Sequence, residues 1–160
     1  MGYTNFLHLC ISTFSAILHL KNTIFSMEGG LMTIYDLFLF AGQSNMAGRG
    51  ITCTHFPEGA PDLISGAGAE FRAISDPTRL YPIAEPFGAL ENNPTGIFEP
   101  GMKTGSLVTS FVNTYFQKTG VPVLGLSSSK GGSVIASWQD HDDYLTDTLT
   151  RLKSAQTFCE

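Results

Sequence analysis

The stretch Ile34–Gly50 reads IYDLFLFAGQSNMAGRG, and it decides the fold. Its apolar run Leu37–Ala41 is short for a helix and fits a strand buried on both faces, as in a parallel sheet. Gly42 breaks the run, and Ser44 follows at its carboxyl end. In open α/β sheets, this edge is where chemical groups face a crevice. The sequence therefore predicts an α/β fold with a parallel sheet and a hydroxyl at that edge.

Two roles are open to Ser44 from its position alone. Serine is a favoured N-cap residue, so Ser44 could simply cap the helix that follows. It could also be a nucleophile, because a helix N-terminus offers backbone N–H groups to a developing oxyanion. The two roles are compatible. The stretch is not the nucleophile elbow of the α/β-hydrolases, because Met46 stands where that motif needs its second glycine.

The composition describes one globular domain. The 160-residue chain is 42% hydrophobic and 14% charged, which is unlike a disordered protein. Its net charge is −5 with only 9 Lys and Arg, so no basic stripe exists for phosphate contacts and we predict no nucleic-acid partner. The cysteines Cys10, Cys53 and Cys159 match no zinc or redox spacing, which predicts free thiols.

The N-terminal segment Met1–Met27 is apolar, and its single charge is Lys21. Polar residues interrupt it, which argues against a membrane span. No positive residues precede the apolar part and no good cleavage site follows it, so a secretion signal is disfavoured and no cellular compartment is assigned. We expect residues 1–31 to form an extra helix or an upstream extension, and the domain to occupy residues 32–160.

Three later segments have regular patterns. Ser106–Lys118 carries a one-face apolar stripe that predicts a helix, with Gly120 at its C-terminal end. Val121–Leu126 predicts a second strand, whose carboxyl end would share an edge with the first strand if the two are parallel. Asp142–Gln156 predicts the last helix, with acidic residues at its start that favour the helix dipole.

The segment Ile51–Lys103 has little periodicity and many prolines and glycines. It is too long for a plain connector. Two interpretations remain open: a structured insertion that forms a substrate wall over Ser44, or a mobile loop. His55 lies in this segment, where a lone histidine is more often solvated than catalytic.

The block Gly42–Met46, GQSNM, closely resembles the first block of the SGNH hydrolases. The closer match is to their carbohydrate-esterase branch, the sialate O-acetylesterase and acetylxylan-esterase-like domains. The serine of this block is the nucleophile in that family, so the resemblance implies that role for Ser44. It also implies a flavodoxin-like, three-layer fold with a parallel sheet, and neither a metal nor an organic cofactor. A weaker likeness to the family's Glu-Pro segment lies at Pro82–Phe87.

A second block lies in Gly125–Gln139, which reads GLSSSKGGSVIASWQ. It resembles the family's Gly-Gly-Thr/Ser block, which is followed by a tryptophan. Because glycines let backbone N–H groups approach a ligand closely, we expect an oxyanion hole from the N–H of Ser44 and that of Gly131 or Gly132. The alternative is a plain glycine-rich turn before a helix. The residues predicted to contact substrate are Gln43, Asn45, Ser133 and Trp138, although Trp138 would also fit the core.

The sequence offers no clear base for Ser44. A serine nucleophile needs a neighbouring imidazole, which the family supplies from an Asp-x-x-His block. None of the 4 histidines follows an aspartate at that spacing, and the family's Gln-Gly-Glu block is also absent. His141 is a poor substitute at the start of an acidic helix.

We therefore expect the N-terminal part of a longer esterase domain, acting on acetyl esters of small molecules or oligosaccharides, with no oligomeric state assigned. The alternatives are a non-catalytic sugar-binding or scaffold protein and a fragment that does not fold stably.

Overall fold

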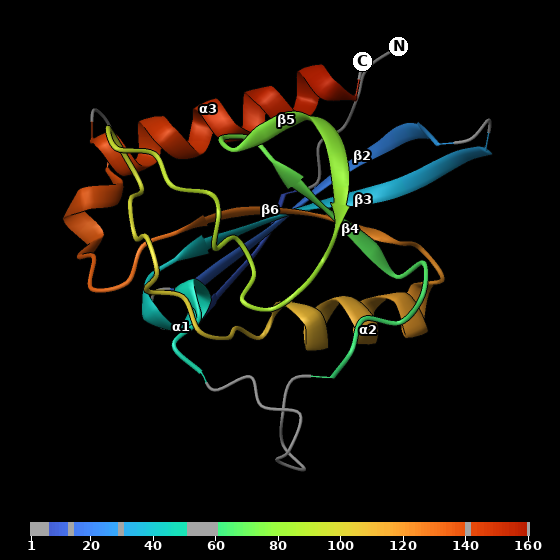
Figure 1. The fold of residues 1–160 in the computed structure, drawn as a ribbon, viewed down its shortest axis with the longest axis horizontal. Coiled ribbons are helices and arrows are strands. Elements are labelled where there is room, and N and C mark those ends of the chain that lie inside the picture. Colours follow the sequence, from blue (N-terminus) through green and yellow to red (C-terminus); the bar gives the residue numbers. More distant parts are fainter. Residues whose placement is uncertain (1–6, 13–14, 29–30, 51–60, 140–141, 160) are drawn as a thin grey trace.

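The computed structural model describes residues 7–12, 15–28, 31–50, 61–139 and 142–159, with side chains from Thr33 onward. A six-stranded mixed sheet in the order β1-β2-β3-β6-β4-β5 runs through its centre (Figure 1). The strands are β1 Leu7–Ser12, β2 Ser15–Glu28, β3 Leu31–Gly42, β4 Gly68–Arg72, β5 Asp76–Pro82 and β6 Val123–Ser129. The helices are α1 Ser44–Ala47, α2 Val108–Thr119, α3 Asp143–Phe158 and the 3₁₀ helix η1 Ile135–Trp138.

The core of the sheet is parallel, as predicted. Strand β3 pairs in parallel with β6, and β6 pairs in parallel with β4. Side chains alternate between the two faces of β3, and both faces are buried: Leu37 is 0% and Phe40 is 1% exposed. Burying one such side chain contributes roughly 1.5–3 kcal/mol, so this strand anchors both layers of the core.

Helices cover both faces of the sheet and give three layers (Figure 1). Helix α2 lies on the face that carries Phe38 and Phe40, and Val108 and Val112 of this helix are fully buried there. Helix α3 lies on the opposite face, where its Ala155 joins the other cluster of buried residues. The three-layer α/β fold that the sequence implied is therefore confirmed.

The predicted helix at residues 106–118 is confirmed as α2, and its start is fixed by Glu85. The carboxylate of Glu85 accepts hydrogen bonds from the backbone N–H of Ser106 at 2.7 Å and from its hydroxyl at 2.8 Å. It also accepts from the N–H of Thr109 at 3.3 Å. Since the first N–H groups of a helix lack partners within the helix, this carboxylate satisfies them. Gly120 ends the helix with a φ of 70°.

The described part of the N-terminal segment forms strands, so the expectation of an extra helix there is wrong. Strand β2 pairs antiparallel with β3, and β1 pairs antiparallel with β2. The sheet is consequently mixed, with parallel strands only at its centre. A free strand edge leaves backbone groups unpaired, and this segment supplies partners for the outer edge of β3. Within the described part of the chain, no helix is long and apolar enough to cross a membrane.

The irregular segment at residues 51–103 is largely ordered in its described part, 61–103. It contributes β4, which joins the parallel core, and β5, which pairs antiparallel with β4. Both strands are short, and Pro77 and Pro82 lie in β5, so their sequence lacks a clear strand pattern. The mobile-loop interpretation is wrong for this part. Cys53 and His55, together with His141, lie outside the described residues.

Candidate active site

The carboxyl ends of β3 and β6 bring the two predicted blocks to one edge of the sheet. Gly42, the last residue of β3, pairs in register with Ser129, the last residue of β6. The N–H of Lys130 donates to the carbonyl of Gly42 at 2.8 Å and extends the pairing. Ser44 and Gly131 each follow two residues after the register partners, so the serine and the glycine loop flank the same edge.

Ser44 is the first residue of α1, and the N-cap of this helix is Gln43. The idea that Ser44 itself caps the helix is therefore wrong. The Gln43 side-chain oxygen accepts long hydrogen bonds from the Ser44 N–H at 3.4 Å and from its hydroxyl at 3.3 Å. Ser44 is partly exposed and Asn45 is exposed. The hydroxyl is thus reachable and loosely held, as an attacking group must be.

The short helix α1 is tied down at its far end. Gly48 closes it, and the Gly48 carbonyl accepts hydrogen bonds from the N–H of Thr104 at 2.9 Å and of Gly105 at 3.3 Å. The N–H of Gly50 returns a bond to the carbonyl of Gly105 at 2.9 Å. Met46 is 2% exposed, so the helix is also held by its buried face. Ser44 therefore stands on a fixed support.

The glycine loop at the end of β6 has little room beside Gly131 and a left-handed backbone at Gly132. A Cβ on Gly131 would collide with the guanidinium of Arg49 and lie 2.8 Å from a carboxylate oxygen of Glu99. Gly132 has a φ of +71°, which L side chains rarely adopt. The loop thus brings bare backbone close to charged groups, which suits N–H donors that approach a ligand.

Ser133 and Trp138 make contacts within this loop. The Ser133 hydroxyl donates to the carbonyl of Lys130 at 2.8 Å and accepts from the Trp138 ring N–H at 3.0 Å. The Trp138 ring also packs against Tyr144 of α3, with centroids 5.6 Å apart. Both residues stiffen the loop, and their contact with substrate stays a prediction.

A buried carboxylate lies behind the loop and was missed in the sequence. The side chain of Glu99 is 2% exposed, and its Oε1 lies 2.5 Å from the Arg49 guanidinium and 3.6 Å from the Lys130 amine. The Arg49 guanidinium also donates to the carbonyl of Met102. Among the described residues, the second oxygen of Glu99 is buried without a hydrogen-bond partner.

Lys103 is the second missed residue, and it lies under the carboxyl end of β6. Its amine is buried and donates to the hydroxyls of Ser127 and Ser129, at 3.1 Å each. Burial lowers the pKa of Lys103 to about 8, although the negative charge of Glu99 opposes that shift. No motif marked either residue, because each meets its partners only in the folded chain.

The lowered pKa of Lys103 predicts a pH-dependent stability. In the unfolded chain its pKa returns to 10.5, so between pH 8 and 10.5 the unfolded state binds more protons than the folded state. Wild-type stability should therefore rise across this window relative to Lys103→Met, which has no titrating amine. Urea unfolding of both proteins from pH 7 to pH 10 measures the difference. A flat difference would show that the Lys103 pKa is not lowered.

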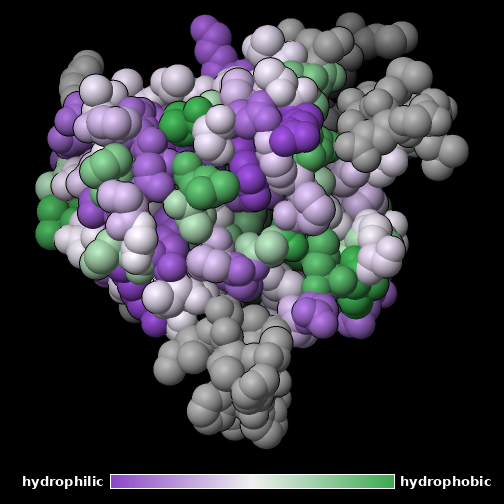
Figure 2. Space-filling view, viewed as in Figure 1, coloured by the Kyte–Doolittle hydropathy of each residue, from purple (hydrophilic) through white to green (hydrophobic). Residues whose placement is uncertain are grey.

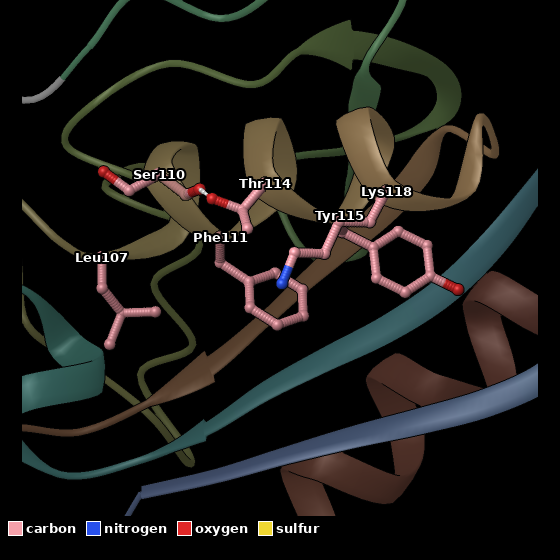
Figure 3. A pocket seen from close by; sticks show the side chains of 6 residues that line it. All are labelled: Leu107, Ser110, Phe111, Thr114, Tyr115 and Lys118. Carbon is pink, nitrogen blue, oxygen red and sulfur yellow. Dashed lines mark hydrogen bonds between the residues drawn. The ribbon is translucent and has the colours of Figure 1, made fainter.

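A groove on α2 lies apart from the strand edge (Figure 3). Its volume is about 430 Å³, and all of its lining comes from α2 and the residue before it. The lining residues are Leu107, Ser110, Phe111, Thr114, Tyr115 and Lys118. On the face seen in Figure 2, hydrophobic residues form scattered patches among polar ones. We therefore place the candidate site at the strand edge, where the reactive groups lie.

The described side chains include no histidine, so the base for Ser44 is not located. They also include no group of three or more metal-ligating side chains. The hydroxyl of the partly exposed Ser44 and the backbone N–H groups of the glycine loop are groups that could support nucleophilic attack by a serine, with N–H donors near a developing negative charge.

Comparison with known families identifies the class to which this arrangement belongs. The family model described as "Carbohydrate esterase, sialic acid-specific acetylesterase" matches residues 34–158, and the chain belongs to this family. The match confirms the predicted esterase family, which is a family of ester hydrolases.

Among solved structures, a protein from Arabidopsis thaliana is similar in fold, with a TM-score of 0.55 and 19% sequence identity. The likeness covers 75% of this chain and 50% of that one, so the chain matches half the length of this relative. Curated proteins gave no significant match.

Proposed function

We propose that this chain is part of a serine-dependent carbohydrate O-acetylesterase in which Ser44 is the nucleophile. One observation carries the proposal: Ser44 and the Gly131 loop each follow two residues after the register partners Gly42 and Ser129. The nucleophile must reach the carbonyl carbon of the ester while the N–H donors reach its oxygen, so the two must lie close together. Their common edge of the sheet supports that placement. Membership of the carbohydrate esterase family supports a sugar acetyl ester as the substrate.

The proposed reaction begins with attack of the Ser44 Oγ on the acetyl carbonyl carbon. A new C–O bond forms, the carbonyl π electrons move to the oxygen, and the Oγ proton passes to a general base. The resulting oxyanion is held by the N–H of Ser44 and that of Gly131 or Gly132, each worth about 3 kcal/mol in such sites. Collapse of this intermediate breaks the bond between the acetyl carbon and the sugar oxygen, which takes the proton back from the base and leaves as the alcohol. Water then hydrolyses the acetylated serine to acetate and free serine.

The proposed substrate contacts come from both blocks. Gln43 and Asn45 flank the nucleophile, and Ser133 and Trp138 lie on the glycine loop. The Trp138 ring is partly buried, so only part of its face is open to a sugar. We assign the catalytic domain to residues 32–160 and regard residues 1–31 as an extension whose two strands add to the sheet.

A non-catalytic sugar-binding protein is the second candidate. It is favoured by the sequence, because none of the 4 histidines follows an aspartate at the spacing of the family's Asp-x-x-His block, and a serine without a base is inert. The same strand edge would then hold a sugar without cleaving its ester.

Acetate release separates the two candidates. Purified chain is incubated with p-nitrophenyl acetate and with O-acetylated xylose and sialic acid, and binding of the same sugars is measured by calorimetry. An esterase should release acetate at a rate above buffer and turn over many equivalents. Binding of the acetylated sugar without acetate release would instead support the sugar-binding protein and contradict the esterase.

A further inference from the structure

We propose that Glu99 is a positioning residue that locks the glycine loop to the segment carrying Ser44. The proposal rests on the function proposed above, because it concerns the geometry of that same site. Neither the family blocks nor the sequence pattern singles out Glu99. Glu99 is singled out instead by its contacts in the folded chain.

The two halves of the site come from distant parts of the chain. Ser44 and Arg49 follow β3, whereas Lys130 and Gly131 follow β6, about 80 residues later. Beyond the strand ends, the backbone bond from Lys130 to Gly42 joins them. An oxyanion hole works only if its donors keep a fixed distance from the attacking atom, so a side-chain connection adds to what the backbone supplies.

Glu99 makes that connection with a single oxygen. Its Oε1 is 2.5 Å from the guanidinium of Arg49, on the Ser44 side, and 3.6 Å from the amine of Lys130, on the loop side. The same oxygen would lie 2.8 Å from a Cβ on Gly131, so the loop backbone packs directly against the carboxylate. The carboxylate of Glu99 therefore pairs with a cation from each segment and lies against Gly131 of the glycine loop.

The burial of Glu99 explains why a charge is needed there. Its side chain is 2% exposed, so water screens the carboxylate weakly, and its attraction for the two cations is strong. Without this charge, Arg49 and Lys130 would face each other and repel. The second carboxylate oxygen is buried without a hydrogen-bond partner among the described residues, so the contacts of this carboxylate with the two cations both go through Oε1.

Amide hydrogen exchange on the full chain tests the proposal without relying on activity. In Glu99→Gln, exchange at Lys130 and Ser133, whose N–H groups donate to the carbonyls of Gly42 and Lys130, should speed up by about tenfold or more, which corresponds to the loss of one charge-assisted hydrogen bond. Exchange at Val112 in α2 should stay unchanged. Unchanged exchange in the loop, or an equal rise throughout the sheet, would overturn the proposal.

Glu91→Gln is the matched control for this experiment. Glu91 is another glutamate with 1% exposure, but its carboxylate accepts from the turn at Ile74 and Ser75 and lies 3.8 Å from Arg151, not from Arg49 or Lys130. Its replacement should speed exchange at that turn and leave the glycine loop as in the wild type. Faster exchange in the glycine loop of Glu91→Gln would mean that any buried charge has this effect, which would also overturn the proposal.

Steady-state kinetics adds a measurement that a general loss of stability would not mimic. If the chain hydrolyses p-nitrophenyl acetate through Ser44, Glu99→Gln should lower kcat by about tenfold or more while KM stays within about twofold, because the loop acts on the transition state. If Glu91→Gln lowered kcat as much as Glu99→Gln does, the positioning role would be contradicted. Wild-type chain without Ser44-dependent turnover would contradict the proposed function, and the exchange data would still decide the role of Glu99.

Discussion

Replacing Arg151 with methionine is expected to lower the free energy of unfolding by about 3–5 kcal/mol. Arg151 is fully buried in α3, and its guanidinium lies 2.9 Å from the carboxylate of Asp147. It also donates to the carbonyls of Ser127 and Glu91, at 3.1 Å each. The Glu91 carboxylate lies 3.8 Å from the same guanidinium. Methionine fills much of the volume but leaves the buried carboxylates of Asp147 and Glu91 without their cation. Such uncompensated charges are what makes the change costly.

Urea unfolding of Arg151→Met measures this cost, with Arg79→Met as the control. Arg79 also pairs with an aspartate, Asp76, but its side chain is 69% exposed, so its loss should change stability little. The double variant Arg151→Met/Asp147→Asn should recover part of the lost stability, because it removes one stranded charge. If Arg151→Met were as stable as Arg79→Met, the buried network would not hold α3 to the sheet.

Replacing Ser44 with alanine is expected to lower kcat for acetyl ester hydrolysis by about a thousandfold or more. The hydroxyl is the only group lost, and in the proposed reaction its oxygen forms the bond to the acetyl carbon. KM should change little, because the substitution leaves the proposed substrate contacts at Gln43 and on the glycine loop in place. Acetate release from p-nitrophenyl acetate, measured at saturating ester, gives both constants.

Ser110→Ala is the matched control for that experiment. Ser110 is an exposed serine on α2 that lines the groove of Figure 3, away from the strand edge. Its replacement should leave kcat unchanged. Equal activity in Ser44→Ala and the wild type would show that hydrolysis occurs elsewhere on the chain, and that the strand edge is not the active site.

The sequence predicts the centre of the fold well, because its signals are local. The apolar run at Leu37–Ala41 predicts a strand and the apolar stripe of α2 predicts a helix, each from the residues of that element alone. Strands β4 and β5 were missed because they are short and depend on pairing with β6 and with each other. The N-terminal strands were missed for a similar reason: β2 exists through its ladder with β3, which no local pattern reports.

The residues of the candidate site also fall into those that the sequence could predict and those that it could not. Ser44 and the Gly131 loop were predictable from two unusual blocks of sequence. Glu99 and Lys103 were not, because Arg49 and Ser127, their respective partners, are 50 and 24 residues away along the chain. Arg151 pairs with Asp147 one helical turn away, but its contacts with Ser127 and Glu91 span 24 and 60 residues. A buried charge is recognisable only when the opposite charge can be placed beside it, and the sequence alone does not give that placement.

The measurement that tests the account most directly is covalent labelling by a fluorophosphonate probe, with the modified residue located by peptide mass spectrometry. Such a probe reacts with an activated serine beside an oxyanion hole and leaves ordinary serines untouched. We expect a single label on Ser44, which is lost in Ser44→Ala and forms more slowly in Glu99→Gln. A label on another serine, or labelling of Ser44 no faster than of Ser110, would contradict the claim that this strand edge is an esterase active site.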